Sequence, residues 1–465
     1  MSNTEHFTRF DLRRSARLLL AAAALATIPV TAFAQFPPVL TPPPNIVLPN
    51  YQGIPVGPFA GLEGSAYVAR IDDPAAAWFN PAGLTRATGA QISGSAGLYQ
   101  YTKLTPKASP NGASSVEHVP NLVGFTLPSK HNLALGMAIL TPVSWTQQTD
   151  TEIVASPSGN PERLGYSSNS DYRRRVIALS AGYDSKKKWR VGGGLTILYS
   201  NLRMTQTSSD RIATPTSLQT LLVSSEVRGT DVKIGSVAGI QFDPHPRIRI
   251  GGVFRTSGFS IYRSGSATLD GTQKVGASSL GASFFDPAAE FHNKLPFEAT
   301  GAFAWIGGRG EIEVDVHGYT SISPYAMLSS PITSAIYQDD GTGAPPTVTK
   351  QPFGGLTSAS RSVGNASVGG RYKLFSGREM RLHFGFSSDM SPVAPEDKVF
   401  DKVDLTAWTI GLSGRAEKLT YAAGFNYRAG TSEDFTVQNV LSGQPYTTNI
   451  HIRTMGMIYS LSYQF

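Results

Sequence analysis

The residues best suited to chemistry lie in one short segment, 311–317. Polar side chains alternate there with apolar ones, and the polar set is Glu311, Glu313, Asp315 and His317. A β-strand would place all of them on one face, about 6.5–7 Å apart. Such a set could bind a metal ion, could supply an acid and a base, or could be a charged wall that faces Arg and Lys side chains of neighbouring strands. We favour the charged wall, because a metal site built from histidine and carboxylates needs ligands from several elements.

Other motifs for catalysis or cofactor binding do not occur in the sequence. No cysteine is present, which excludes disulfides, thiolate metal sites and cysteine nucleophiles. There is no Gly-Lys-Ser/Thr loop for phosphate and no serine nucleophile motif that would indicate a lipase-like enzyme. Arg381 and His383 fit a ladder of polar side chains better than a catalytic pair. We therefore predict a protein that is not an enzyme and that uses no cofactor and no metal.

The strands that would position these side chains follow from a period of two. From Met455 to Phe465 every second residue is large and apolar, and most residues between them are small or polar. This pattern indicates a β-strand with one apolar face. Strands of soluble proteins have about 5–6 residues, whereas strands that cross a membrane need about 9–11. The length therefore favours a transmembrane strand.

The same alternation recurs along the chain and predicts fourteen strands. They are 90–101, 119–128, 132–143, 173–184, 189–204, 226–242, 247–262, 296–306, 310–322, 361–375, 378–389, 404–414, 419–429 and 452–465. Their short and long connections alternate, as do the periplasmic turns and external loops of outer-membrane barrels. A closed sheet pairs every backbone polar group inside the hydrocarbon. We therefore expect an all-β fold, a 14-stranded antiparallel transmembrane β-barrel with both chain ends in the periplasm.

The composition agrees with a barrel and argues against other classes. Gly and Pro number 47 and 31 among 465 residues, and charged residues make up 16%, against about 25% in soluble globular proteins. This profile argues against a helical bundle, a coiled coil and an acidic disordered chain. The formal net charge of +7 is modest for this length and includes Arg residues near the N-terminus, so we expect no nucleic-acid partner.

Residues 1–34 have the three parts of a secretory signal peptide. Basic residues come first, an apolar run of Leu and Ala follows, and Ala32-Phe33-Ala34 provides a small-x-small cleavage site. The apolar run is shorter than the about 20 residues of a spanning helix, so a membrane anchor is the weaker interpretation. The pair Arg13-Arg14 is also a weak match to a twin-arginine signal, which is an alternative type of signal peptide. We predict cleavage after Ala34.

The segment 35–88 lies between the signal peptide and the first strand. Residues 36–58 are rich in Pro and are either a disordered periplasmic tail or the start of a plug. Residues 59–88 are rich in small residues and contain turns at Asp73-Pro74 and Asn80-Pro81. We predict packed irregular structure there, followed by a barrel over 89–465.

The run from Asp72 to Leu84 resembles the hatch signature of the FadL/TodX family, outer-membrane transporters of long-chain fatty acids and aromatic hydrocarbons. In both, small residues precede an aspartate, aromatic residues and Asn-Pro-Ala-Gly-Leu. The last five are Asn80, Pro81, Ala82, Gly83 and Leu84 in this sequence. Weaker similarities follow at Leu295-Pro296, which resembles the entry to the family's eighth strand, and at Ser391-Pro392-Val393, which resembles the segment after its eleventh.

The resemblance implies a fourteen-stranded barrel that an N-terminal hatch plugs from the periplasmic side. It also implies that oily substrates enter from an outer groove and leave sideways at a kink in the third strand, with residues 80–84 as the gate beside that opening. Asn80 can donate to and accept from the barrel wall, and Pro81 fixes a bend. An ordinary Asn-Pro turn is the alternative. The Pro-rich start departs from the family, and residues 389–404 do not map closely onto it.

Two expected external loops carry apolar residues that a porin for polar solutes would not need. In the third loop, Leu218, Leu221 and Leu222 stand at helical spacing. The fourth loop contains Phe284, Phe285 and Phe291. These side chains could form an outer groove for oily ligands, or they could pack the loops against one another.

These observations predict a passive channel for hydrophobic compounds, such as long-chain fatty acids or hydrocarbons, in the outer membrane of a Gram-negative bacterium. We expect an N-terminal plug and either lateral or periplasmic release of the substrate. Its partners would be outer-membrane lipid, a hydrophobic small molecule, and the barrel-assembly machinery acting on the final strand that ends in Phe465. A general porin and a structural or adhesive barrel are the alternatives. We favour the channel, because a porin would not need the small-residue segment around Asn80.

Overall fold

The computed structural model describes residues 50–52, 56–106, 113–128, 131–155, 161–186, 188–215, 217–376, 379–397, 399–438 and 445–465. The chain divides into Met1–Pro38 and Val39–Phe465, and every described residue belongs to the second unit. The predicted signal peptide and most of the Pro-rich segment therefore lie outside the described residues. None of the helices in the described part is long and apolar enough to cross a membrane.

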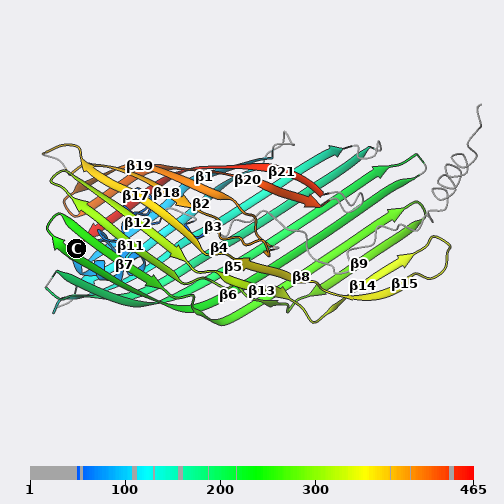
Figure 1. The fold of residues 1–465 in the computed structure, drawn as a ribbon, viewed down its shortest axis with the longest axis horizontal. Helices are drawn as coiled ribbons and strands as arrows, with labels where there is room; N and C mark the ends of the chain where they lie inside the picture. Colours follow the sequence, from blue (N-terminus) through cyan, green and yellow to red (C-terminus); the bar gives the residue numbers. More distant parts are fainter. Residues whose placement is uncertain are drawn as a thin grey trace, which may run out of the picture. The chain divides into compact units, whose positions relative to one another are not determined.

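Fourteen antiparallel strands of the described residues close into a ring (Figure 1). They are β1 (Gln91–Pro106), β2 (Ala113–Pro128), β3 (Leu133–Ala155), β4 (Glu162–Asp184), β5 (Trp189–Ala213), β6 (Leu218–His245), β7 (Ile248–Arg255), β11 (Glu298–Ile306), β12 (Gly310–Tyr319), β17 (Val363–Lys373), β18 (Arg381–Asp389), β19 (Asp404–Ala416), β20 (Leu419–Gln438) and β21 (Pro445–Gln464). Each strand pairs with the next in this order, and β21 returns to pair with β1. The predicted 14-stranded antiparallel barrel is confirmed.

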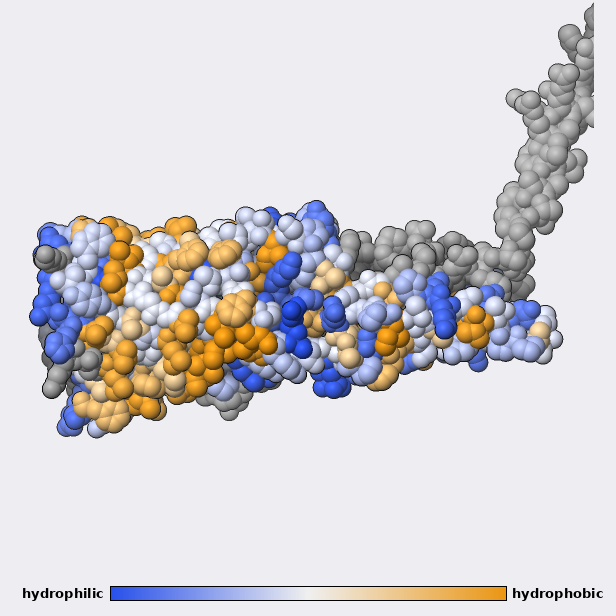
Figure 2. Space-filling view, turned by 90° about the horizontal axis from the view of Figure 1, so that it is seen from below, coloured by the Kyte–Doolittle hydropathy of each residue, from blue (hydrophilic) through white to orange (hydrophobic). Residues whose placement is uncertain are grey.

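Side chains of the ring alternate between the lumen and the outer wall. In β5, Trp189, Val191 and Leu195 are exposed on the outside, whereas Arg190, Gly192 and Gly194 face inward. Figure 2 shows hydrophobic side chains gathered over the barrel part of one face. An outer apolar band of this kind is the surface that a membrane barrel presents to lipid.

Several strands continue well beyond the ring on the external side. β4, β5 and β6 have 23, 25 and 28 residues, against the about 9–11 that a membrane requires. The outer part of β6 pairs with β8 (Phe259–Val275), and the sheet continues through β9 (Ser278–Asp286), β14 (Thr333–Asp339) and β15 (Thr347–Pro352). These strands form a sheet that extends one wall of the barrel (Figure 1).

This extension corrects two expectations about the external loops. The residues expected as the third loop are largely paired strand, because β5 and β6 stay in register as far as Ala213↔Leu218. The helix expected from the spacing of Leu218 and Leu221 is wrong, since both lie in β6. Apolar residues separated by polar ones in this segment reflect the two faces of a strand.

A separate three-stranded sheet consists of β10 (Glu290–Phe291), β13 (Ile322–Ser329) and β16 (Leu356–Ser360). Its first strand packs against the inner face of β6, where a side chain at Gly229 would collide with the ring of Phe291. Other residues of the small sheet line the cavity that is described below.

Residues 56–88, which we call the plug, precede β1 and lie inside the barrel. The plug contains one turn of α-helix, α2 (Ala76–Phe79), and the 3-10 helix η1 (Pro81–Arg86). Leu62, Tyr67 and Leu84 are fully buried against the lumen wall. The prediction of packed structure in this segment is confirmed, and its turns hold it in a compact form through bonds such as Ser65 N–H to the Ala60 carbonyl, 2.8 Å.

Candidate functional site

Asn80 joins the plug to the barrel wall at the start of η1. Its Nδ2 donates to the carbonyl oxygens of Val68 in the plug and Ile240 in β6, each at 3.0 Å. Its Oδ1 accepts from the backbone N–H of Ala82 at 3.2 Å and caps η1. The side-chain nitrogen therefore bonds to the barrel wall, and the side-chain oxygen bonds within the plug at the start of η1. The role of residues 80–84 as a gate stays a prediction.

The wall around Asn80-Pro81 is built from inward-facing glycines on three neighbouring strands. Gly182, Gly192 and Gly239 lie side by side across β4, β5 and β6. A Cβ at Gly182 would stand 2.6 Å from the Pro81 carbonyl oxygen, and one at Gly192 would collide with the backbone of Pro81 and Ala82. The plug backbone thus touches the wall where the wall has no side chains.

Strand β12 holds the plug through two inward carboxylates. Glu313 accepts from the backbone N–H groups of Ala69 at 2.6 Å and Arg70 at 3.1 Å. Asp315 accepts from the backbone N–H groups of Tyr67 at 3.1 Å and Val68 at 3.3 Å. Both carboxylates are fully buried. They satisfy plug donors that would otherwise be stranded away from water.

Arg70 lies at the centre of the same cluster and is also fully buried. Its Nε donates to Glu313 at 2.8 Å, its Nη1 lies 3.5 Å from Glu311, and it forms an ion pair with Glu63. Glu311 pairs in addition with Arg371 of β17 at 2.8 Å. Three carboxylates and two guanidinium groups from the plug and two strands thus form one network.

This network corrects the charged-wall interpretation in one respect. Of the predicted set, Glu311 does face an Arg of the neighbouring strand, but the partners of Glu313 and Asp315 come from the plug. His317 instead bridges the hydroxyls of Thr300 and Ser367 at 2.9 and 3.2 Å. His383 lies 2.8 Å from Glu63 of the plug. The predicted polar wall exists, and most of it serves to seat the plug.

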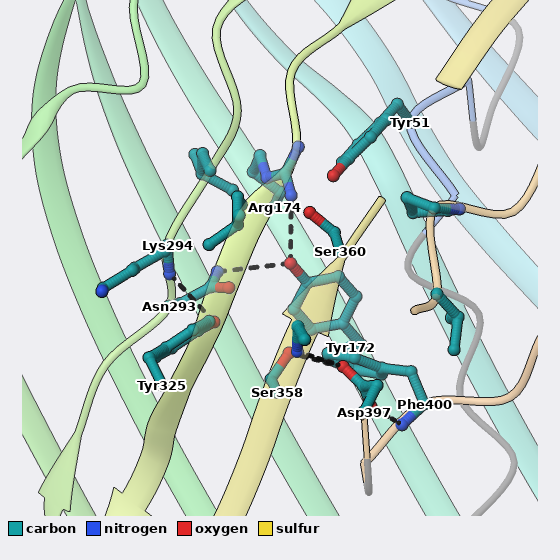
Figure 3. Close-up of a pocket in the computed structure, with 15 residues that line it drawn as sticks. Tyr51, Tyr172, Arg174, Asn293, Lys294, Tyr325, Ser358, Ser360, Asp397 and Phe400 are labelled. Atoms are coloured by element: carbon teal, nitrogen blue, oxygen red, sulfur yellow. Dashed lines mark hydrogen bonds between the residues drawn. The ribbon is translucent and has the colours of Figure 1, made fainter. Parts of the chain in front are cut away.

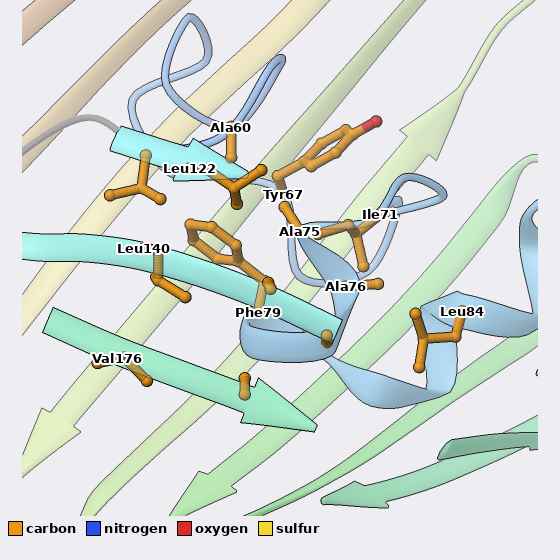
Figure 4. Close-up of a cluster of buried hydrophobic side chains, with 14 of the residues drawn as sticks. Ala60, Tyr67, Ile71, Ala75, Ala76, Phe79, Leu84, Leu122, Leu140 and Val176 are labelled. Atoms are coloured by element: carbon orange, nitrogen blue, oxygen red, sulfur yellow. The ribbon is translucent and has the colours of Figure 1, made fainter. Parts of the chain in front are cut away.

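The plug and the wall bury a continuous cluster of apolar side chains (Figure 4). We call it the apolar cluster, and its members include Phe79 and Leu84 of the plug and Leu122, Leu140, Val176 and Leu198 of β2, β3, β4 and β5. Trp78 and Leu295 pack against it and remain partly exposed. Partly exposed side chains such as these two are the apolar surface that the cluster leaves accessible.

The ladder between β2 and β3 ends at this cluster. Within the described residues their pairing runs from Pro128↔Ala134 to Leu122↔Leu140 and stops there. Beyond that point β2 continues to pair with β1, and β3 resumes pairing with β4 at Val143 after a register shift. The wall therefore has an unpaired seam between β2 and β3 that begins next to the apolar cluster.

The sequence explains why the seam begins there. Continuing the register by two residues would place Pro120 opposite Pro142. Proline has no backbone N–H and is disfavoured in the interior of a sheet. The two prolines stand in predicted neighbouring strands, and they are the signal in the sequence for this break in the pairing. The register shift lies in β3, the third strand, which is the strand in which the family resemblance implied a kink.

A small cavity of about 30 Å³ lies between β4, the small sheet and the loop after β18 (Figure 3). Two cationic residues line it, Arg174 and Lys294. The Arg174 Nη2 donates to the Tyr172 hydroxyl at 3.0 Å, whereas its Nε is buried with no hydrogen-bond partner among the described residues. The Lys294 ammonium lies 4.8 Å from the centre of the Tyr325 ring. The cavity can thus accept an anionic or strongly polar group.

Asp397 is the one carboxylate that lines this cavity, and both of its oxygens already accept hydrogen bonds from the protein. Its Oδ2 accepts from the Ser358 hydroxyl at 2.7 Å and the Ala359 N–H at 2.8 Å, and its Oδ1 accepts from Val399 and Phe400. Burial raises the pKa of Asp397 above its ordinary value, and burial raises the pKa of Tyr51 to about 12. Asp397 thus bonds to its own loop and to β16, and it makes no ion pair with Arg174 or Lys294 among the described residues.

The structure separates the six predicted ligand residues, of which five lie in β6 and β9 of the extended sheet and Phe291 lies in β10 of the small sheet. Leu221, Phe284 and Phe291 are buried, and Phe284 stacks on Phe353 with ring centroids 4.3 Å apart. The other three, Leu218, Leu222 and Phe285, are exposed. The predicted residues therefore do not form one groove, and their role in ligand binding stays a prediction. Sequence reasoning missed Arg174 and Lys294, although Arg174 stands in the run Arg173-Arg174-Arg175 at the start of a predicted strand.

These features define a class of protein: a transmembrane β-barrel whose lumen is occupied by an N-terminal plug. A family model described as "Outer membrane protein transport protein (OMPP1/FadL/TodX)" matches residues 58–465. The chain belongs to this family, and it is therefore an outer-membrane protein of a Gram-negative bacterium and a channel for hydrophobic compounds. The prediction of a transporter and not an enzyme is confirmed.

Solved structures of this fold agree with the family. A FadL homologue of Pseudomonas aeruginosa is 13% identical and aligns over 90% of this chain and 100% of its own, with a TM-score of 0.58. The Pseudomonas putida toluene transporter TodX is 12% identical over 90% and 100% of the two chains, with a TM-score of 0.56. The Ralstonia pickettii toluene transporter TbuX is 15% identical over 90% and 99%, with a TM-score of 0.51. No curated protein matches the sequence.

Proposed function

We propose that this channel carries amphipathic compounds with a long apolar chain and an anionic head, as in long-chain fatty acids, and releases them sideways between β2 and β3. Transport is passive and follows the gradient of the substrate. The observation that carries the proposal is the seam that begins at Leu122↔Leu140 beside the apolar cluster.

The choice of an amphipathic substrate rests on two neighbouring environments. Leu295 lines the cationic cavity and also packs against the apolar cluster. A molecule whose head lies near Arg174 can therefore extend its chain past Leu295 toward the seam. Each methylene that leaves water contributes about 0.8 kcal/mol, and a charge-assisted hydrogen bond contributes about 1.5–3 kcal/mol. A hydrocarbon without a polar head, such as the toluene named for TodX, would gain only the free energy of burying apolar surface.

The sideways path is supported by the way the plug is held. The plug is bonded to β12 through Glu313 and Asp315, and to β6 through Asn80. Moving the plug out of the lumen would break these bonds. It would leave the carboxylates of Glu313 and Asp315 without partners, and an unpaired buried charge costs much free energy. A seam already present in the wall needs no such displacement.

A cross-link across the seam tests the proposed exit. The chain has no cysteine, so Asn121→Cys with Thr141→Cys gives a single pair at the first positions beyond the ladder. Joining this pair with a short bifunctional maleimide should lower fatty-acid uptake strongly, because the two strands can no longer separate. Uptake is measured in cells that lack other transporters of this kind, before and after cross-linking.

The matched control is Phe125→Cys with Met137→Cys, which lie opposite each other within the paired ladder. Cross-linking this pair should leave uptake unchanged, because these strands are already joined there. Unchanged uptake in the seam variant, with complete cross-linking shown by mass spectrometry, would refute lateral release.

Substitution of Arg174 tests the head group. Arg174→Gln should weaken binding of a long-chain fatty acid by about tenfold, which corresponds to the loss of one charge-assisted hydrogen bond. Binding of the corresponding methyl ester should hardly change, because it carries no anionic head. Tryptophan fluorescence of the purified barrel can follow both titrations. Equal losses for acid and ester would contradict the assignment of Arg174 and would leave the exit test unaffected.

A further inference from the structure

The outer wall of β4, β5 and β6 changes from apolar to basic at one level. Along β5 the exposed side chains are apolar from Trp189 to Tyr199. This stretch is about 33 Å along the strand, or about 25 Å along the barrel axis at the usual tilt, which matches the apolar band of membrane barrels. The next outward residues are Asn201 and Arg203. The level of Tyr199 is thus the external boundary of the band.

Four arginines stand on the outer face just beyond this boundary. They come from three adjacent strands and are Arg173 and Arg175 of β4, Arg203 of β5 and Arg228 of β6. The strand register brings them together: Arg175 lies opposite Tyr199, Arg173 opposite Asn201, and Arg203 opposite Arg228. We call these four residues the basic patch. In Figure 2, strongly hydrophilic side chains likewise follow the hydrophobic band toward the extended sheet.

Two carboxylates accompany the basic patch and do not neutralise it. Asp171 lies 2.9 Å from Arg173, and Glu226 lies 3.1 Å from Arg203 and 2.7 Å from Arg228. Four positive groups against two negative ones leave an excess of positive charge. The side chains of Arg203 and Arg228 are 57% and 56% exposed, and Arg175 forms no ion pair with the described residues. Several guanidinium donors therefore face outward.

We propose that the basic patch binds the phosphate groups of a phosphorylated glycolipid in the outer leaflet of the outer membrane. The acyl chains of such a lipid would lie on the apolar band of β4–β6, and its phosphates would then stand at the level of the patch. Guanidinium groups bind phosphate through paired hydrogen bonds. Basic residues beside a membrane surface attract anionic lipid head groups in the same way.

The chain offers a matched control higher on the same wall. Arg163 and Arg211 also lie opposite each other on β4 and β5, and Arg163 lies 3.6 Å from Glu152. This pair repeats the arrangement of Arg203, Arg228 and Glu226. It lies eight residues further out along β5, which is about 26 Å. A lipid whose chains are in the membrane does not reach it.

Lipid binding by the purified, detergent-solubilised protein tests the proposal. The probes are bis-phosphorylated lipid A and the same lipid after removal of both phosphates, each titrated without divalent cations and followed by native mass spectrometry. The wild-type protein should bind the phosphorylated lipid at least about tenfold more tightly, since several charged hydrogen bonds depend on the phosphates. Equal binding of the two lipids would overturn the proposal, and this comparison needs no variant.

Variants then test the location of the site. Arg175→Gln with Arg203→Gln and Arg228→Gln should remove most of the preference for the phosphorylated lipid, while Arg163→Gln with Arg211→Gln should keep it. Heat-modifiable mobility in gel electrophoresis checks that each barrel is folded. A triple variant that binds like the wild-type protein, or an equal loss in the control, would overturn the assignment to the basic patch.

Discussion

At the scale of single residues, contact between plug and wall depends on where side chains are absent as much as on where they are present. The inward glycines of β4, β5 and β6 let the backbone at Pro81 reach the wall, so that Asn80 can bond to Ile240. A glycine in a strand weakens the strand itself. Here close packing and a hydrogen bond compensate for that loss.

Gly192→Val should displace the plug at Pro81 and make the channel leak. The new side chain would enter space that the backbone of Pro81 and Ala82 occupies, and overpacking of this kind costs about 1–3 kcal/mol. Ion conductance in planar bilayers should rise. Gly193→Val is the control, because its side chain points outward and its Cβ would lie 3.6 Å from the nearest atom, the Val237 carbonyl oxygen. Similar conductance of the two variants would argue against this account.

At the scale of elements, β12 is both a membrane strand and the main anchor of the plug. Its outward residues Val314 and Val316 are exposed, while Glu313 and Asp315 between them are buried against the plug. A strand can serve both roles because successive side chains point to opposite faces. The length of β4–β6 adds a second function to the wall, since these strands carry the extended sheet beyond the membrane level.

Glu313→Ala should loosen the plug without opening the barrel. The substitution strands the N–H groups of Ala69 and Arg70 and leaves the Arg70 guanidinium with one carboxylate fewer, at a cost of about 3–5 kcal/mol. Proteolytic cleavage within the plug should become faster in the detergent-solubilised protein. Val314→Ala, on the other face of the same strand, should be cleaved at the wild-type rate. If both variants resist cleavage equally, β12 is not the anchor.

At the scale of the whole molecule, the plug decides whether the ring is a pore. Barrels somewhat larger than this one leave an aqueous channel when the lumen is empty, whereas here the buried network around Arg70 and the apolar cluster fill it. A closed cylinder with a fixed plug and a seam in its wall favours molecules that enter lipid over solutes that remain in water.

Deletion of residues 56–88 should turn the closed channel into a water-filled pore. Conductance should rise by about an order of magnitude, toward that of porins, and liposomes that contain the variant should swell in sugar solutions. Deleting residues 341–344 in the β14–β15 hairpin provides a control, since this tip lies at the external end of the extended sheet. If the variant without residues 56–88 still excludes sugars, residues other than the plug close the lumen.

Much of the fold follows from local patterns, and much of the site does not. The strand from Met455 to Phe465 is visible in the sequence because alternation is a property of neighbouring residues. The outer halves of β5 and β6 are not visible in the same way, since their Ser and Thr residues are compatible with both loop and strand. Only their register, ending at Ala213↔Leu218, shows that they pair.

The sequence by itself determined the set of barrel strands, their inward and outward faces, and the family signature around Asn80, because each depends on residues close together in the chain. The tertiary structure decided which groups meet. Glu313 binds the N–H of Ala69, and Leu122 and Leu140 mark the start of the seam, only because the ring closes around the plug. Closure fixes the register between distant strands, and no local pattern encodes that register.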